Sequence, residues 1–205
     1  LLVDLVASPL VSKTYDGTTA ATLSDANYTL SGVVSGDSVL LSPGSASYAN
    51  ASAGTGKLVS VSALAVASAR ETNSGKPVYG YSLPVGATAT SPIGIILPRP
   101  LSISGTSASD KTYDGTTTAT INVGSLSGLV GAESVSAIGV GSFDSKNAGA
   151  RVATASYSLV DGSGGGLASN YTLAPTSGLS ATIFQKGLSI SGTSASDKTY
   201  DGTTT

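Results

Sequence analysis

The sequence contains no cysteine, methionine, histidine or tryptophan in its 205 residues. Without cysteine, the chain can form neither a disulfide bond nor a thiolate metal site. Without histidine, it lacks the side chain that most often serves as a general base and as a zinc ligand. These absences argue against an enzyme. We therefore expect no catalytic residue, no cofactor and no bound metal ion.

Charged side chains are also scarce, at 11% of the sequence, and the formal net charge is −2. Nucleic acids are bound through basic surfaces that contact phosphates, so we expect no nucleic-acid partner. No apolar run approaches the roughly 18 residues of a membrane span, so we expect no membrane insertion. The start, Leu1–Val6, lacks the basic segment of a signal peptide. We therefore expect an internal fragment of a longer secreted protein.

Residues typical of strands and turns dominate what remains. The chain has 26 glycines, and serine and threonine supply most of its polar side chains. Aromatic residues are limited to nine tyrosines and two phenylalanines, so the cores should be small. Apolar runs nevertheless recur throughout, which argues against disorder. This composition favours an all-β protein.

An internal repeat determines the domain organisation. Residues 188–205 are identical to residues 101–118 at all 18 positions, and the core Lys-Thr-Tyr-Asp-Gly-Thr-Thr occurs once more at Lys13–Thr19. We predict two modules, residues 1–98 and 99–186, followed by the opening strand and turn of a third repeat in residues 187–205. The Pro98-Arg99-Pro100 junction leaves no room for a flexible hinge, so the modules should be elongated and joined end to end.

Apolar segments come at intervals of about ten residues and are separated by turn signals, which predicts a β-sandwich-like module. A β-grasp-like module with one short helix is the alternative. In module 1 the longest strand is expected at Leu58–Val66. In module 2 strands are expected at Leu101–Ser107, Thr116–Val123, Ser134–Phe143, Arg151–Val160, Tyr171–Ala174 and Leu179–Phe184.

Several landmarks follow one another in the same order in both modules. Gly36-Asp37-Ser38-Val39 corresponds to Ala132-Glu133-Ser134-Val135, and Gly80-Tyr81-Ser82-Leu83 corresponds to Asn170-Tyr171-Thr172-Leu173. Together with Lys-Thr-Tyr-Asp-Gly-Thr-Thr, this order resembles the YDG repeat of bacterial haemagglutinin-like exoproteins. The resemblance implies large surface adhesins secreted by a two-partner pathway, in which such repeats form a stalk. It implies no catalytic residues.

The Tyr-Asp-Gly motif itself is interpreted as a structural turn. Its three copies are Tyr15, Asp16 and Gly17; Tyr113, Asp114 and Gly115; and Tyr200, Asp201 and Gly202. Gly115 should adopt a positive φ, and Asp114 should accept a hydrogen bond from the N–H of Thr116 or Thr117. The Tyr113 ring should then cover the end of the module core. Tyr113→Ala is predicted to cost about 2–4 kcal/mol of stability.

Three binding or cross-linking alternatives stay open. Asp16, Asp110 and Asp114 are candidate calcium ligands, although calcium usually needs more carboxylates at close spacing. Lys111 with Asn122 or Asn170 is a candidate for an intramolecular isopeptide bond. Direct binding of a carbohydrate or receptor is the third, and it should show as an exposed tyrosine-lined groove that only one module has.

The composition, the repeat and the resemblance together predict a structural function. We expect stalk or spacer repeats of an adhesin at the extracellular bacterial cell surface, which extend a binding head for adhesion or biofilm formation. The expected partners are neighbouring repeats of the same chain, with host or matrix glycans or other cells contacted through the parent adhesin.

Overall fold

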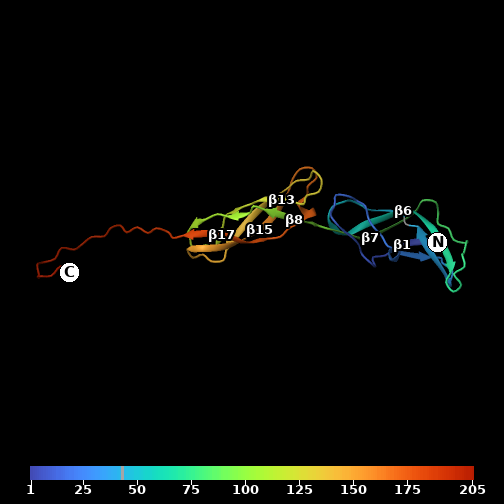
Figure 1. The fold of residues 1–205 in the computed structure, drawn as a ribbon, viewed down its shortest axis with the longest axis horizontal. Helices are drawn as coiled ribbons and strands as arrows, with labels where there is room; N and C mark the ends of the chain where they lie inside the picture. Colours follow the sequence, from blue (N-terminus) through green and yellow to red (C-terminus); the bar gives the residue numbers. More distant parts are fainter. Residues whose placement is uncertain (43) are drawn as a thin grey trace.

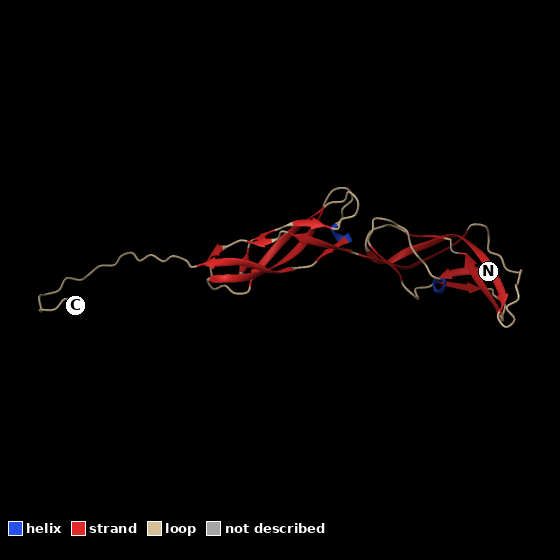
Figure 2. Ribbon diagram, viewed as in Figure 1, coloured by secondary structure: helices blue, strands red, loops and turns tan. Residues whose placement is uncertain are grey.

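The computed structural model describes residues 1–42 and 44–205. Two elongated β modules lie end to end, and the last residues run away from the second module as an extended trace (Figure 1). The helical part of the described chain consists of two three-residue 3-10 turns, η1 (Asp25–Asn27) and η2 (Ala168–Asn170) (Figure 2). The all-β prediction is confirmed. Each module contains one of these short turns, and its remaining regular structure is strand. Neither 3-10 turn is long and apolar enough to cross a lipid bilayer.

The described residues of the first module form seven strands, and the long strand β6 (Gly54–Glu71) is the centre of its main sheet. The order in this sheet is β2-β7-β6-β4, and β5 pairs with another part of β6. A separate pair joins β1 to β3. The remaining bounds are β1 (Leu2–Leu5), β2 (Val11–Thr14), β3 (Tyr28–Ser31), β4 (Asp37–Ser42), β5 (Ser45–Tyr48) and β7 (Ala87–Leu97).

The second module repeats this plan with shorter edge strands. Its main sheet has the order β10-β17-β15-β14-β11, and a smaller sheet has the order β13-β8-β16. The strands are β8 (Arg99–Ser104), β9 (Ser107–Ala108), β10 (Lys111–Thr112), β11 (Thr118–Ala119), β12 (Ile121–Asn122), β13 (Ser125–Ser127), β14 (Val135–Phe143), β15 (Gly149–Asp161), β16 (Tyr171–Leu173) and β17 (Thr176–Phe184).

In both modules the strand before the Tyr-Asp-Gly turn lies parallel to the last strand. β2 pairs with β7, and β10 pairs with β17, each in parallel. The ladder continues beyond the strands, since the Tyr15 N–H donates to the Leu97 carbonyl and the Tyr113 N–H donates to the Phe184 carbonyl, both at 2.8 Å. The turn is thereby fixed at the far end of each module.

Alternation of side chains along β6 explains how so few large residues make a core. Val59 and Val61 lie on one face of the strand and are fully buried. A bulge after Val61, with Ala63 at φ 59°, shifts the alternation so that Leu64 is buried as well. The buried face of this strand therefore extends beyond the bulge.

Four of the predicted strands of module 2 match single strands of the structure, with differences at their ends. The predicted strand Thr116–Val123 is instead divided into β11 and β12, and Leu101–Ser107 spans β8 and the start of β9, which lie in different sheets. Two short strands, β10 and β13, were not expected, because two or three polar residues carry no readable alternation. The predicted opening strand in residues 187–205 is also not present. No strand is assigned between residues 185 and 205, where Leu188 and Ile190 are 93% and 85% exposed. In module 2 the matching strand β8 has neighbours on both sides, whereas this segment has none in the described chain.

Candidate functional site: the Tyr-Asp-Gly turn and the module junction

A lysine, an aspartate and a threonine close the Tyr-Asp-Gly turn. In module 2 the Thr116 N–H donates to Asp114 Oδ1 at 2.9 Å, which is the hydrogen bond that the sequence predicts. Lys111 Nζ donates to the same Asp114 oxygen at 2.8 Å and to the Thr116 carbonyl at 2.9 Å. Gly115 has a φ of 80°. The turn is thus held by one ion pair and a set of short local bonds.

The other copies of the motif have the same geometry. Lys13 Nζ lies 2.7 Å from Asp16 Oδ1, and Lys198 Nζ lies 2.8 Å from Asp201 Oδ1. The lysine also lies over an aromatic ring in each module, 5.6 Å from the Tyr48 centroid and, for Lys111, 5.7 Å from that of Phe143. Such a contact stabilises the ammonium group electrostatically. The turn in the tail shows that most of the local bonds do not require a module around them.

The ion pairs change the acidity of the aspartates. Although burial raises the pKa of Asp16, hydrogen bonds from Lys13 and Thr18 hold that pKa to about 2. Hydrogen bonds from Lys111 and then Thr116 lower the pKa of Asp114 to about 2. Both carboxylates are therefore charged throughout the physiological pH range.

The candidate calcium ligands do not gather in one place. Asp16 and Asp114 belong to different modules, and each accepts from its own lysine. Asp110 Oδ1 accepts from the Thr182 N–H at 2.5 Å and so joins β17 to the segment before the turn. Within the described residues, no three histidine, cysteine or acidic side chains are grouped as metal ligands.

The residues proposed for an isopeptide bond are also apart. Lys111 is bonded within the turn. Asn122 Nδ2 donates to Ser109 Oγ at 3.0 Å, on the short β9–β12 sheet. Asn170 lies at the opposite end of module 2, where its Oδ1 accepts from the Ala53 N–H of module 1 at 2.8 Å. These residues therefore serve separate hydrogen bonds.

The exposure of the motif tyrosine differs between the three copies, although their local sequences are the same. Tyr15 is 4% exposed, Tyr113 is 36% exposed and Tyr200 is 93% exposed. Tyr113, which was expected to cover the end of the module 2 core, is thus only partly covered in the described chain. The copy with a module packed against it, Tyr15, is the most buried of the three. The stability cost predicted for Tyr113→Ala belongs to Tyr15 instead.

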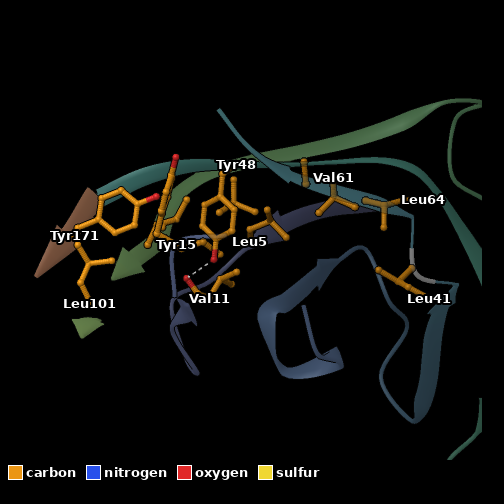
Figure 3. Packing of buried hydrophobic residues seen from close by; sticks show 13 residues of the cluster. Leu5, Val11, Tyr15, Leu41, Tyr48, Val61, Leu64, Leu101 and Tyr171 are labelled. Carbon is orange, nitrogen blue, oxygen red and sulfur yellow. Dashed lines mark hydrogen bonds between the residues drawn. The ribbon is translucent and has the colours of Figure 1, made fainter. Parts of the chain in front are cut away.

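Tyr15 is buried because module 2 packs on it. The rings of Tyr15 and Tyr171 meet edge to face, with centroids 5.5 Å apart and an angle of 82° between their planes. Both hydroxyl groups donate to the Glu133 carboxylate, each at 2.6 Å. Figure 3 shows Tyr15 between the Tyr48 side of module 1 and the Tyr171 and Leu101 side chains of module 2. One hydrophobic cluster therefore continues across the junction.

Hydrogen bonds accompany the hydrophobic contact between the two modules. The Val130 N–H donates to the Tyr171 hydroxyl at 3.1 Å, so this oxygen both accepts and donates. Burial, followed by the hydrogen bond to Glu133, raises the pKa of Tyr15 to about 12. A methyl group built on Gly17 would lie 2.9 Å from Cγ1 of Val130. The close approach of the two modules at this point therefore requires glycine.

Sequence reasoning aligned Glu133 with Asp37 and Tyr171 with Tyr81, but it missed that these residues form a pair. In module 1 the Tyr81 hydroxyl donates to Asp37 Oδ2 at 2.7 Å, and it accepts from the Val34 N–H at 2.8 Å. The same three positions therefore form the same bonds at the start of each module. The available signal was the recurrence of an acidic residue and a tyrosine in the same order.

Fold and junction together define a protein of tandem β modules whose repeated motif lies where one module meets the next. A family model described as the YDG domain matches the chain twice, at residues 5–85 and 97–178. The chain belongs to the YDG domain family. Comparison with curated proteins gave no match. Comparison with solved structures gave none either.

Proposed function

We propose that this chain is a spacer: tandem YDG modules that hold a binding region at a distance from the extracellular surface of a bacterial cell, in a haemagglutinin-like adhesin that serves adhesion or biofilm formation. The observation that supports it best is the packed junction. β7 ends at Leu97 and β8 begins at Arg99, so a single residue separates the modules. The junction buries Tyr15, Leu101 and Tyr171 to 6% exposure or less.

A spacer must resist bending as well as separation. Two rings in edge-to-face contact and one carboxylate shared by two hydroxyl groups fix the relative rotation of the modules, because each contact is directional. The bond from Ala53 to Asn170 adds a contact outside the aromatic pair. Bending the junction would break these contacts and expose apolar surface to water.

Small-angle X-ray scattering, with spin-label distances between the modules, tests the proposal. The native chain should show an elongated particle and a single narrow distance distribution. Tyr15→Ala should broaden that distribution while both modules stay folded. A compact particle with the modules side by side, or a broad distribution in the native chain, would show that the modules do not act as a spacer.

A second candidate function is carbohydrate binding by module 1, and one observation favours it. A hollow of about 290 Å³ is lined by Val66–Arg70, Pro77, Val78, Tyr79 and Tyr81. Tyr79 is 92% exposed there, and the position aligned with it in module 2 is Ser169. Exposed aromatic rings in hollows of this kind stack on sugars, and Ser169 gives module 2 no aromatic ring at the aligned position.

Glycan-array binding of the native chain and of Tyr79→Ala distinguishes the two functions. Loss of a specific glycan signal in Tyr79→Ala would favour binding. Ser169→Tyr serves as a matched control, because it places a tyrosine at the aligned position of module 2, where the native residue is serine. No glycan signal from the native chain would leave the spacer as the function of these modules.

A further inference from the structure

Both halves of the junction occur a second time, at the outer ends of the two modules. At the start of module 2, Tyr15 packs against a set of three residues joined by hydrogen bonds: Glu133, Tyr171 and Val130. The same mutual bonds occur at the start of module 1, among Asp37, Tyr81 and Val34. We call each of these sets a receiving group. The presenting group, the Tyr-Asp-Gly turn, is repeated by Tyr113 at the far end of module 2.

The outer copies of the two groups have their internal hydrogen bonds, but no other module covers them in the described chain. Val34 is 64% exposed, whereas Val130 at the filled junction is partly buried. A methyl group built on Gly115 would meet no atom of the described chain within 4 Å, although one on Gly17 would meet Val130. The Lys111–Asp114 pair nevertheless holds the second turn in the same conformation as the first. The surface around Tyr113 thus has the shape of the Tyr15 surface without its neighbour.

The attached tail indicates what covers this surface. Residues 188–205 repeat residues 101–118, so Leu188 aligns with Leu101. Three residues separate Leu97 from Leu101, and three separate Phe184 from Leu188. A module that begins with this tail would therefore start at the same spacing from the turn as module 2 does. Leu101 is 6% exposed in the filled junction, whereas Leu188 is 93% exposed.

We propose that the Tyr113 end of module 2 is a docking surface for a further YDG module that begins with residues 188–205. The acidic residue and tyrosine of that module accept and pack against Tyr113, as Glu133 and Tyr171 do with Tyr15. This inference deepens the proposed spacer function and rests on it, because it names the partner and the residues that recognise it. The receiving group of Asp37, Tyr81 and Val34 has the same mutual bonds at the outer end of module 1.

The identity of the two 18-residue segments allows a direct experiment. A copy of residues 119–186 is appended after Thr205, so that the tail becomes part of a third module identical to residues 101–186 of module 2. Tyr113 then lies at the new junction, and Tyr200, in the same local sequence, takes the outward position. Tyr113→Ala and Tyr200→Ala in this extended chain form a matched pair.

We expect Tyr113→Ala to lower the unfolding midpoint of the extended chain more than Tyr200→Ala does. It should also broaden the spin-label distance distribution between the second and third modules. Tyr113→Phe, which keeps the ring, should give a smaller change, as should Glu133→Gln in the appended copy. In the native 205-residue chain, Tyr113→Ala should have little effect.

Equal effects of Tyr113→Ala and Tyr200→Ala would overturn the docking surface. If scattering still shows the extended chain to be longer than the native one, the spacer function would stand without this contact. If the added module folds back and the particle does not lengthen, the spacer function itself would be wrong. Dimers of the native chain that Tyr113→Ala dissociates would overturn the proposal too, because the occupant would then be a second copy.

Discussion

At the scale of single residues, one repeated sequence has different surroundings in each copy. Gly17 and Gly115 both have positive φ values, 77° and 80°, and both follow an aspartate that is paired with a lysine. Any side chain at either position is strained to a similar degree, because L residues rarely adopt this conformation. The two positions differ in what lies beyond them, since only Gly17 faces Val130.

This difference allows a comparison of two alanine variants, in which the strain of a positive φ is common to both and cancels. Gly17→Ala should lower the free energy of unfolding more than Gly115→Ala does, by about 1–3 kcal/mol, which is the usual cost of overpacking. Chemical denaturation of the two variants measures it. Val130→Ala in the Gly17→Ala background should reduce the excess. Equal losses in the two single variants would mean that the modules do not approach as closely as the structure shows.

The paired aspartates predict a dependence on pH. The folded pKa values of Asp16 and Asp114 are about 2, below their ordinary value of 3.8. A depressed folded pKa contributes stability that is present above the unfolded pKa and is lost as pH falls through the folded pKa. The thermal midpoint should therefore fall between about pH 4 and pH 2, as circular dichroism can record.

The double variant Asp16→Asn, Asp114→Asn should be less stable at neutral pH and should lose less on acidification. Asn keeps an oxygen that can accept the turn hydrogen bond but removes the ion pair with lysine. The double variant Asp4→Asn, Asp197→Asn, at two exposed positions outside the turns, controls for the change in net charge. An unchanged acid response in the double variant would show that the turns do not contribute to it.

At the scale of elements, the two modules fill the same volume with different residues. In module 1, Gly94 lies under Tyr48 and Val59, and a methyl group built on it would be 2.6 Å from Tyr48 Cε1 and 2.8 Å from Val59 Cγ2. The registers of β2 with β7 and of β10 with β17 align Gly94 with Ala181. The pairing of β5 with β6 and of β14 with β15 aligns Val59 with Ala153. A glycine and a valine therefore replace two alanines.

A double-mutant cycle tests this exchange of volume. Gly94→Ala should cost about 1–3 kcal/mol through overpacking, and Val59→Ala about 2 kcal/mol through the cavity it leaves. The double variant should cost clearly less than the sum, because the added methyl group occupies part of the space that valine vacates. Additive losses in denaturation would contradict the exchange.

These elements also show how far the sequence could predict the structure. Long strands such as β14 and β15 were predicted because their apolar residues alternate over many positions. The short strands β10 and β13 are set by neighbouring strands, and single-sequence patterns do not carry that information. The turn and its aspartate hydrogen bond were predicted, because the residues that form that bond are two positions apart in the sequence. Glu133 was not recognised as part of the junction, because its partner Tyr15 lies 118 residues away.

At the scale of the whole molecule, we expect the junction to couple the unfolding of the two modules. Tyr15→Ala removes a buried ring, a shared hydrogen bond and an aromatic contact, and should cost about 3–5 kcal/mol. It should also separate the unfolding of the two modules into distinct transitions. Differential scanning calorimetry measures both effects. Tyr113→Ala is the matched control and should cost much less, because its ring is already partly in water. Similar losses in both variants would show that the junction is not what stabilises Tyr15.

The parallel pairing of β2 with β7 has a mechanical consequence for such a chain. When the two ends of the molecule are pulled apart, the force acts on the amino end of β2 and on the carboxyl end of β7. Because the two strands are parallel, these opposite forces shear one strand along the other. Their hydrogen bonds lie across the direction of sliding and are loaded together, rather than opened one after another from an end. The same holds for β10 and β17. Each module should therefore yield to tension only when the hydrogen bonds of this parallel pair break together.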